Sequence, residues 1–406
     1  MIQVGCSTIE PEGIEMVNDV LKSGMLSYGK YSKLFEQEFA EAHESKYGVI
    51  VSSGTDALRI ALATLKEVHR WKDGDEVICP ALTFIASSNV ILQNNLKPVF
   101  VDVRPDTYNI DAKRIPNAIT KRTRAILPVH LFGLPAEMSA ISAIGKKYRL
   151  KIVEDSCETM FVKHQGKPVG AWGDMACFSY YMAHLVTTGV GGMIVTKNAH
   201  YASVARSYAN HGRDIAYMGG SLGFQKIGDP NVIKKRFLYH RIGYSSRVTE
   251  MEAALGLAQL RKSVSVIIPR LFTADLIKDG LRAKGLDKYL QLPVDVPGAE
   301  QSNMMLPLVL KKGNAVKLMA HLEKVGIETR RLMPLLNQPV YRKIFGDIEK
   351  KYPVAKWLAR NGFYIGCHQQ MTHKDVDHVV DTLAGYFTEK TMSEWERSRG
   401  LCDVDR

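Results

Sequence analysis

The sequence contains no long apolar run, and this limits the classes of protein to which the chain can belong. No stretch of about 18 apolar residues occurs, so no membrane-spanning helix is expected. The first residues, MIQVGCSTIEPEG, lack a basic segment followed by an apolar core, so no secretory signal peptide is expected. The sequence therefore predicts a cytoplasmic protein without a membrane partner.

Cysteine is scarce and widely spaced. Six cysteines occur among 406 residues without a C-x-x-C pair, which predicts reduced, partly buried thiols and no metal site. Internal repeats, low-complexity segments and recognised nucleic-acid motifs are also lacking. The net charge of +12 therefore indicates a solvated surface, with attraction of an anionic substrate as the functional alternative.

Apolar runs rich in β-branched residues alternate with helical patterns through the first two thirds of the chain. Such strands, nearly continuous in apolar character and separated by helices, predict an α/β fold with a mostly parallel sheet covered on both faces. The strands are expected at 48–53, 75–80, 97–103, 124–130 and 151–155, and the helices between them at 55–68 and 137–149.

The pattern changes after residue 213. Segment 214–240 is glycine-rich and too long for an ordinary connection, so we expect it to reach a partner subunit. We predict a large cofactor-binding domain at 1–267, including an N-terminal arm, and a smaller α+β domain at 268–406. Further helices are expected at 249–267, 314–325 and 374–386, and a strand at 304–310.

Short motifs place polar or aromatic residues where strands end. In SSGTDAL, Gly54 permits a turn, and the amides of Gly54, Thr55 and Asp56 face any anion at the helix start, although a plain N-cap is the alternative. In VEDSCE, Asp155 can pair with a protonated ring nitrogen or cap a helix. In PALTFIASS, Phe84 can cover a flat ring or pack in the core.

Taken together, the motifs resemble one known family. SSGTDAL, PALTFIAS, VEDSCE, GAWGDMACFSYY, TTGVGGMIVT, HGRD and GYSSRVTEMEAALGLAQL occur in this order. Over roughly residues 8 to 386, the chain is similar to the DegT/DnrJ/EryC1/StrS sugar aminotransferase family. The resemblance implies the fold type I architecture of aminotransferases that depend on pyridoxal 5'-phosphate (PLP). It also implies PLP or pyridoxamine 5'-phosphate (PMP) as cofactor, and a homodimer with active sites at the subunit interface.

The resemblance implies a role for each residue of these motifs. Gly54, Thr55 and Ser179 would hold the cofactor phosphate, and Phe84 would stack on the pyridine ring. Asp155 would pair with the ring nitrogen and keep it protonated, which makes the ring an electron sink.

Further residues are placed by the same resemblance. Glu158 would lie near the ring hydroxyl. Ser245 stands where the family usually has an asparagine that reaches across the dimer to the phosphate, and Val190 stands where it usually has glutamate. Arg330 would lie near the substrate phosphates, because its planar fork suits a diphosphate, and a surface salt bridge is the alternative.

Five residues after Ser179 stands His184, where most of the family has the lysine that binds the cofactor covalently. Imidazole cannot form that link, but it can move protons near neutral pH. The substitution resembles the sugar 3-dehydratase branch, in which histidine takes a proton from the cofactor methylene carbon and the sugar C3 hydroxyl leaves. The loop after HGRD contains no cysteine, so no iron–sulfur cluster is expected. This is similar to the cluster-free GDP-4-keto-6-deoxymannose 3-dehydratases.

The leading interpretation is a PMP/PLP-dependent 3-dehydratase of a nucleotide-linked 4-keto-6-deoxy sugar, with glutamate as amino donor and release of ammonia. Such a reaction belongs to deoxysugar biosynthesis, for lipopolysaccharide or secondary metabolites. The enzymatic alternative is a nucleotide-sugar 4-aminotransferase or related PLP enzyme that uses another lysine, for example Lys163. A cofactor-binding regulator without turnover is a third class. The residues leave the nucleotide and the sugar stereochemistry open.

Overall fold

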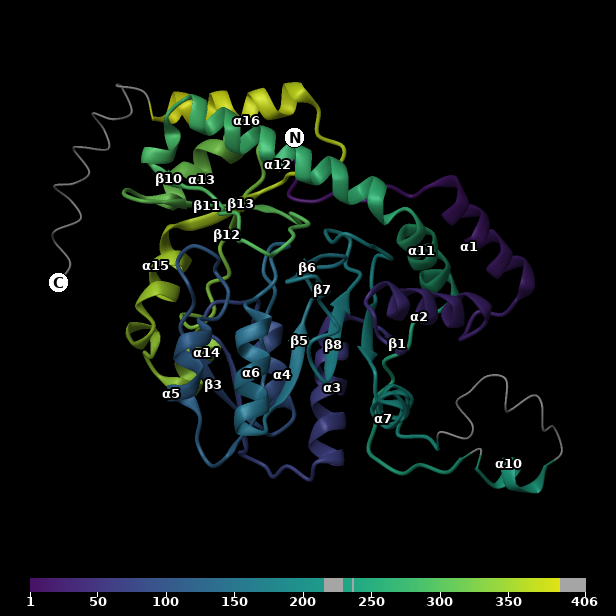
Figure 1. The fold of residues 1–406 in the computed structure, drawn as a ribbon. Helices are drawn as coiled ribbons and strands as arrows, with labels where there is room; N and C mark the ends of the chain where they lie inside the picture. Colours follow the sequence, from purple (N-terminus) through teal and green to yellow (C-terminus); the bar gives the residue numbers. More distant parts are fainter. Residues whose placement is uncertain (215–228, 236, 388–406) are drawn as a thin grey trace.

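The structure is a computed structural model that describes residues 1–214, 229–235 and 237–387 (Figure 1). Most of the segment predicted to reach a partner subunit, including the cysteine-free stretch after HGRD, lies outside the described residues. So does the end of the second predicted domain, at 388–406.

A seven-stranded sheet forms the large layer, in the order β1-β9-β8-β5-β4-β2-β3. Strand β9 is antiparallel to both of its neighbours, whereas the other adjacent pairs are parallel. The predicted mostly parallel α/β sheet is therefore confirmed. The strands are β1 (Tyr47–Val51), β2 (Glu76–Pro80), β3 (Lys97–Val101), β4 (Thr123–Ile126), β5 (Lys151–Asp155), β8 (Met175–Ser179) and β9 (Gly192–Thr196).

Helices cover both faces of this sheet because the buried side chains of each strand alternate between the faces. Val49 and Val51 belong to the apolar cluster that includes α3, whereas Ile50 between them belongs to the cluster beneath α2 and α11. The helices of this domain are α1 (Pro11–Ser23), α2 (Lys30–Ala42), α3 (Gly54–Val68), α4 (Ile85–Gln93), α5 (Ile115–Ala118), α6 (Met138–Tyr148), α7 (Ala199–Ala209), α10 (Pro230–Lys235) and α11 (Glu250–Arg261).

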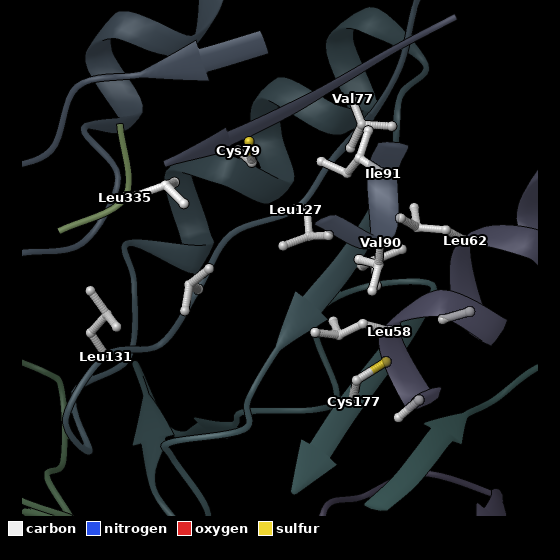
Figure 2. Packing of buried hydrophobic residues seen from close by; sticks show 14 of the residues in the cluster. Leu58, Leu62, Val77, Cys79, Val90, Ile91, Leu127, Leu131, Cys177 and Leu335 are labelled. Atoms are coloured by element: carbon white, nitrogen blue, oxygen red, sulfur yellow. The ribbon is translucent and has the colours of Figure 1, made fainter. Parts of the chain in front are cut away.

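Helix α3 is the centre of the larger core. Leu58 and Leu62 of α3 face Val90 of α4 and Cys177 of β8, and all four side chains are almost fully buried (Figure 2). Burial of a leucine of this kind contributes roughly 1.5–3 kcal/mol. This packing fixes the start of α3 against the end of β8, which becomes important for the site.

A second, antiparallel sheet of order β10-β11-β13-β12 carries its own apolar cluster. Ile2 joins this cluster, and its amide donates to the Gly326 carbonyl at 2.7 Å, so the N-terminus is attached to the smaller layer. The elements here are α12 (Ser263–Ala283), β10 (Leu290–Gln291), β11 (Leu306–Leu310), α13 (Ala315–Lys324), β12 (Arg330–Arg331), β13 (Gly362–Ile365) and α16 (His373–Tyr386). Helices α14 (Pro339–Phe345) and α15 (Pro353–Asn361) lie between β12 and β13 in the sequence but bury their apolar side chains in the larger core. A short hairpin of β6 (Lys163–His164) and β7 (Lys167–Pro168) completes the fold.

The prediction of a single helix at 249–267 is wrong. The helix is interrupted at Lys262, which follows the last residue of α11 and precedes the first residue of α12. Helix α11 packs between α1 and α2, whereas α12 packs on α16 of the smaller layer (Figure 1). One straight helix cannot pack against both layers. The hydrophobic periodicity of a sequence does not indicate where the helix axis changes direction. None of the described helices is long and apolar enough to cross a bilayer.

Candidate active site

Four of the predicted site residues meet at one edge of the large sheet. Gly54 begins α3 directly after β1, Phe84 precedes α4 after β2, Asp155 ends β5 and Ser179 ends β8. The carboxyl ends of parallel strands open at a common edge, which is where open α/β sheets bind ligands. The prediction that strand ends carry the site is consistent with this arrangement.

Gly54 forms the floor of a tight cradle. A Cβ atom on Gly54 would lie 2.6 Å from the Ser179 Cβ and 2.8 Å from the Cys157 Sγ. The amide of Asp56 does not face the cradle as expected, because the Ser53 hydroxyl caps it at 3.0 Å. The amides of Gly54 and Thr55, in a first helical turn where N–H groups have no helical partner, and the Ser179 hydroxyl therefore form a donor set that fits a phosphate.

We expect Gly54→Ala to weaken cofactor binding by about fivefold to 150-fold, the range that corresponds to overpacking by 1–3 kcal/mol. The new methyl group would displace Ser179 or Cys157, whose side chains have no room to yield. Equilibrium dialysis against PMP measures this loss. Gly385→Ala is the matched control, because a Cβ there meets no heavy atom within 4 Å. Equal PMP affinity in Gly54→Ala and the parent protein would contradict the cradle.

Two acidic side chains lie side by side beneath the cradle. Asp155 accepts hydrogen bonds from the Ser87 hydroxyl at 2.7 Å and the Cys157 amide at 3.2 Å, and burial raises its pKa. Glu158 accepts from the Phe132 amide at 3.1 Å, and burial, with the nearby Asp155 charge, raises its pKa to about 8.

No lysine or arginine of the described residues acts electrostatically on either of these carboxyl groups. His130 is the one basic side chain among the described residues that acts on Asp155, and it does not offset the effect of burial, so a ligand that brings positive charge is favoured there. A protonated pyridine nitrogen beside Asp155 meets this requirement. The carboxyl of Glu158, whose pKa is raised to about 8, can share a hydrogen bond with a ring hydroxyl, so the site fits a pyridoxal-type cofactor.

The raised pKa of Glu158 predicts how the stability of the cofactor-free protein varies with pH. Its folded pKa of about 8 lies above the usual value of 4.5. The folded state therefore holds a proton that the unfolded state loses, and the free energy of unfolding should fall as pH rises from about 4.5 to 8. Glu158→Gln should remove this part of the slope in urea titrations at several pH values. Identical slopes for the variant and the parent protein would contradict a protonated Glu158.

Phe84 lies at the mouth of the site and not in the core. The residue is 58 % exposed and occupies the N-cap position of α4 without a capping hydrogen bond from its side chain. The alternative of plain core packing is therefore wrong, and an exposed ring beside Asp155's strand edge is free to cover a flat ligand.

His184 lies on the loop between β8 and β9, half-buried. Its Nδ1 is 3.0 Å from the carbonyl oxygen of Ser179. A carbonyl can only accept, so Nδ1 carries the proton and Nε2 keeps its lone pair. Burial, together with the charge of Arg270, lowers the pKa of His184 to about 4, against a weaker opposing effect of the Ser179 hydrogen bond. At neutral pH, His184 is therefore a neutral imidazole that can accept a proton at Nε2.

The remaining predicted residues lie outside this cluster within the single chain. Ser245 is exposed and accepts from the Arg247 guanidinium at 3.2 Å. Val190 is 58 % exposed in the loop after His184. Lys163, the alternative lysine, is exposed on the β6 hairpin.

Arg330 is exposed on β12 and forms an ion pair with Glu328. In the single chain without substrate, Arg330 therefore forms the surface salt bridge that was the alternative to substrate binding. Its charge also acts on the Tyr364 hydroxyl, as does that of Glu158. Tyr364 is also the strand partner of Arg330 in the pairing of β12 with β13.

Sequence reasoning missed three participants. Ser87 donates to Asp155, and Cys157 contacts both Asp155 and the cradle. Tyr364 pairs with Arg330 across neighbouring strands, and Glu158 acts on it electrostatically. The role of Ser87 could have been predicted from the sequence, because a serine one turn after Phe84 on a mostly apolar helix lies at the same edge of the sheet. The role of Tyr364 could not have been predicted in this way, because its strand belongs to the smaller sheet.

Comparison with known proteins identifies the family to which the chain belongs. The DegT/DnrJ/EryC1/StrS aminotransferase family model matches residues 7–384. A Yersinia pseudotuberculosis protein named GDP-4-keto-6-deoxy-D-mannose 3-dehydratase is 31 % identical, covering 93 % of this chain and 96 % of that one. An Escherichia coli O157:H7 protein named GDP-perosamine synthase is 30 % identical, with 93 % and 96 % covered.

The solved structures agree with the fold. The structure of E. coli GDP-4-keto-6-deoxy-D-mannose-3-dehydratase with bound hydrated PLP superposes with a TM-score of 0.85 at 28 % identity. It covers 94 % of this chain and 99 % of the other. The expected fold type I aminotransferase architecture is thereby confirmed, with its large mostly parallel sheet and smaller antiparallel sheet.

Proposed function

We propose, from the premise that this chain belongs to the DegT/DnrJ/EryC1/StrS aminotransferase family, that it is a 3-dehydratase of a nucleotide-linked 4-keto-6-deoxy sugar. Family membership makes it a PLP-dependent enzyme that modifies nucleotide sugars, with PLP or PMP as cofactor. Dehydratases and perosamine synthases both occur among its relatives at about 30 % identity, so the choice between these reactions depends on the residues of the site.

The observation that carries the proposal is His184. A neutral imidazole, held by the Ser179 carbonyl at 3.0 Å, stands five residues after Ser179, where a covalent cofactor needs an amine. Imidazole supports proton transfer but no stable link to the cofactor aldehyde. This combination favours elimination with a freely bound cofactor over amino transfer from a tethered one.

Each residue then has a defined task. When bound, PMP supplies the amine that condenses with the sugar ketone and a ring that stores electrons. Gly54, Thr55 and Ser179 hold the phosphate, and Asp155 keeps the ring nitrogen protonated. His184 accepts a proton at Nε2, while the Ser179 carbonyl fixes the orientation of its ring. Phe84 covers the site and excludes water.

We propose that a homodimer completes this site, with glutamate as the amino donor. Ile242 and Phe237 are 95 % and 80 % exposed in the single chain, and large apolar side chains so exposed are typical of an interface. Ser245 follows in the same segment, next to Arg247, and both would reach the partner's site. Light scattering that returns a monomer would contradict this part of the proposal.

The reaction is tested by incubating the protein with PMP, glutamate and a panel of 4-keto-6-deoxy sugars linked to GDP, CDP or dTDP. We expect one of them to give a 3-deoxy-4-keto product together with ammonia, detected by mass spectrometry and a coupled ammonia assay. A 4-amino sugar as the sole product would establish the aminotransferase alternative. In that case, borohydride should also trap the cofactor on a lysine peptide.

A further inference from the structure

Arg270 of α12 is a fully buried guanidinium that forms no ion pair with an acidic side chain within residues 1–214, 229–235 and 237–387. Its exposure is 0 %. Nη1 donates to the Met304 carbonyl at 2.8 Å and Nε donates to the Gln369 amide oxygen at 3.1 Å. Nη2 is buried without a hydrogen-bond partner. The two partners are neutral, so the positive charge is left uncompensated.

The ionisable groups around Arg270 do not supply a negative charge. The two that act on it are the thiols of Cys6 and Cys367. Burial raises the pKa of Cys6, and it raises that of Cys367 to about 12, so both are neutral. Burial lowers the pKa of Arg270 itself, which is the expected response of a cation without a counter-ion.

His368 adds a second unsatisfied group in the same region. It is 7 % exposed, its ring nitrogens make no hydrogen bond of good geometry within the described residues, and the backbone of Gln3 is the hydrogen-bonding group that acts on the ring. The charge of Arg270 acts on His368 directly. Asp375 from α16 also acts on His368, and Lys278 acts on Cys367.

These groups lie where the two layers of the fold meet. A Cβ at Gly366 would lie 2.1 Å from the Gln3 carbonyl oxygen, and one at Gly5 would lie 2.9 Å from the Cα of Ala183. The N-terminal segment is therefore clamped between the residues after β13 and the loop that carries His184. Arg270 is therefore closed to solvent, and its charge acts on His184 of the proposed active site.

We infer that Arg270 and His368 form a buried site for a small monovalent anion of the halide class, chloride in solution. An unpaired buried charge costs several kcal/mol, whereas a bound anion offsets the charge and accepts from Nη2 at the same time. A water molecule would also accept a hydrogen bond from Nη2, but it would not neutralise the positive charge of the guanidinium. Complete burial excludes a nucleotide or a sugar phosphate, so this site is separate from substrate binding and does not depend on the proposed function.

The site also has a consequence for His184, whose neighbouring groups are the Ser179 carbonyl, the Tyr181 ring and Arg270. The positive charge of Arg270 disfavours the imidazolium. An anion beside Arg270 reduces that effect and makes Nε2 a stronger base. Halide binding at the layer junction would therefore adjust the proton acceptor without touching the substrate.

Bromide, which has an anomalous X-ray signal, tests the site directly on the unmodified protein. Crystals grown without halide and soaked in sodium bromide should give an anomalous peak within hydrogen-bond distance of Arg270 Nη2. In solution, Tm should rise by several degrees in sodium chloride relative to sodium gluconate at equal ionic strength. Arg270→Met should abolish this difference, whereas Arg282→Met should keep it, since Arg282 of the same helix is an exposed arginine paired with Asp279.

The crystal and wild-type Tm measurements do not require the variant to fold. No anomalous peak beside Arg270 would overturn the inference. A chloride effect on Tm that persists unchanged in Arg270→Met would overturn it as well, because the stabilising anion would then bind elsewhere. Neither readout requires turnover, so a failed sugar assay leaves this test intact.

Discussion

Replacing His184 with glutamine is expected to lower turnover by about 10²–10⁴-fold, the usual contribution of a general acid–base group. Glutamine fills similar space and forms hydrogen bonds, but it cannot accept a proton at neutral pH. The Gly54 cradle and the Asp155 carboxylate are untouched, so PMP binding should be nearly unchanged. Single-turnover kinetics with the accepted sugar nucleotide measure the chemical step, and equilibrium dialysis measures retention of the cofactor.

A second variant at the same position separates proton transfer from covalent attachment. His184→Lys supplies the amine that the parent loop lacks, so borohydride should then fix PLP to the chain and add its mass to the peptide that contains residue 184. The parent protein should show no such adduct. An adduct on the parent protein, or full turnover by His184→Gln, would contradict the role given to His184.

The pH dependence of this group has a definite sign. Burial and the Arg270 charge lower the pKa of His184 to about 4, so the imidazole loses its proton well below neutral pH. The proton-accepting form therefore dominates from pH 5 upward in the cofactor-free protein, and a ring titration followed by NMR should have its midpoint near 4. An unshifted histidine would instead titrate near 6.5.

The strand ends could be predicted from the sequence because one physical signal marks them. Buried parallel strands are continuous apolar runs, and Asp155 and Ser179 follow such runs directly. The convergence of these residues then follows from the geometry of a parallel sheet. The motif resemblance added the family and its cofactor, which the strand pattern alone does not specify.

Features that depend on contacts between distant segments gave no such signal. Arg270 looks like any surface arginine of an amphipathic helix until the N-terminal segment and the residues after β13 close over it. The break at Lys262 arises because α11 and α12 serve different layers. Each outcome is decided by packing, which sequence periodicity does not encode.

Asp155→Asn should change activity and stability in opposite directions. Asparagine can still accept from the Ser87 hydroxyl, which Asp155 binds at 2.7 Å, but it carries no charge to hold the ring nitrogen protonated. We expect turnover to fall by about 10²–10³-fold, the scale for loss of one preorganised electrostatic partner. The Tm of the cofactor-free protein should be unchanged or higher, because burial already raises the pKa of Asp155 and the amide avoids that cost.

The opposite signs distinguish a cofactor partner from a structural carboxylate. Ser87→Ala is the matched control, since it removes one hydrogen bond to Asp155 but leaves the charge, and its turnover should fall far less. Thermal unfolding of the cofactor-free proteins and steady-state kinetics with saturating PMP give the two measurements. If Asp155→Asn lost activity only in proportion to a lower Tm, the carboxylate would hold the fold and not the ring. Burial raises the pKa of Asp155 despite its hydroxyl and amide donors and the charge of His130, so a cationic ligand should stabilise its charged form, and the variant tests that dependence directly.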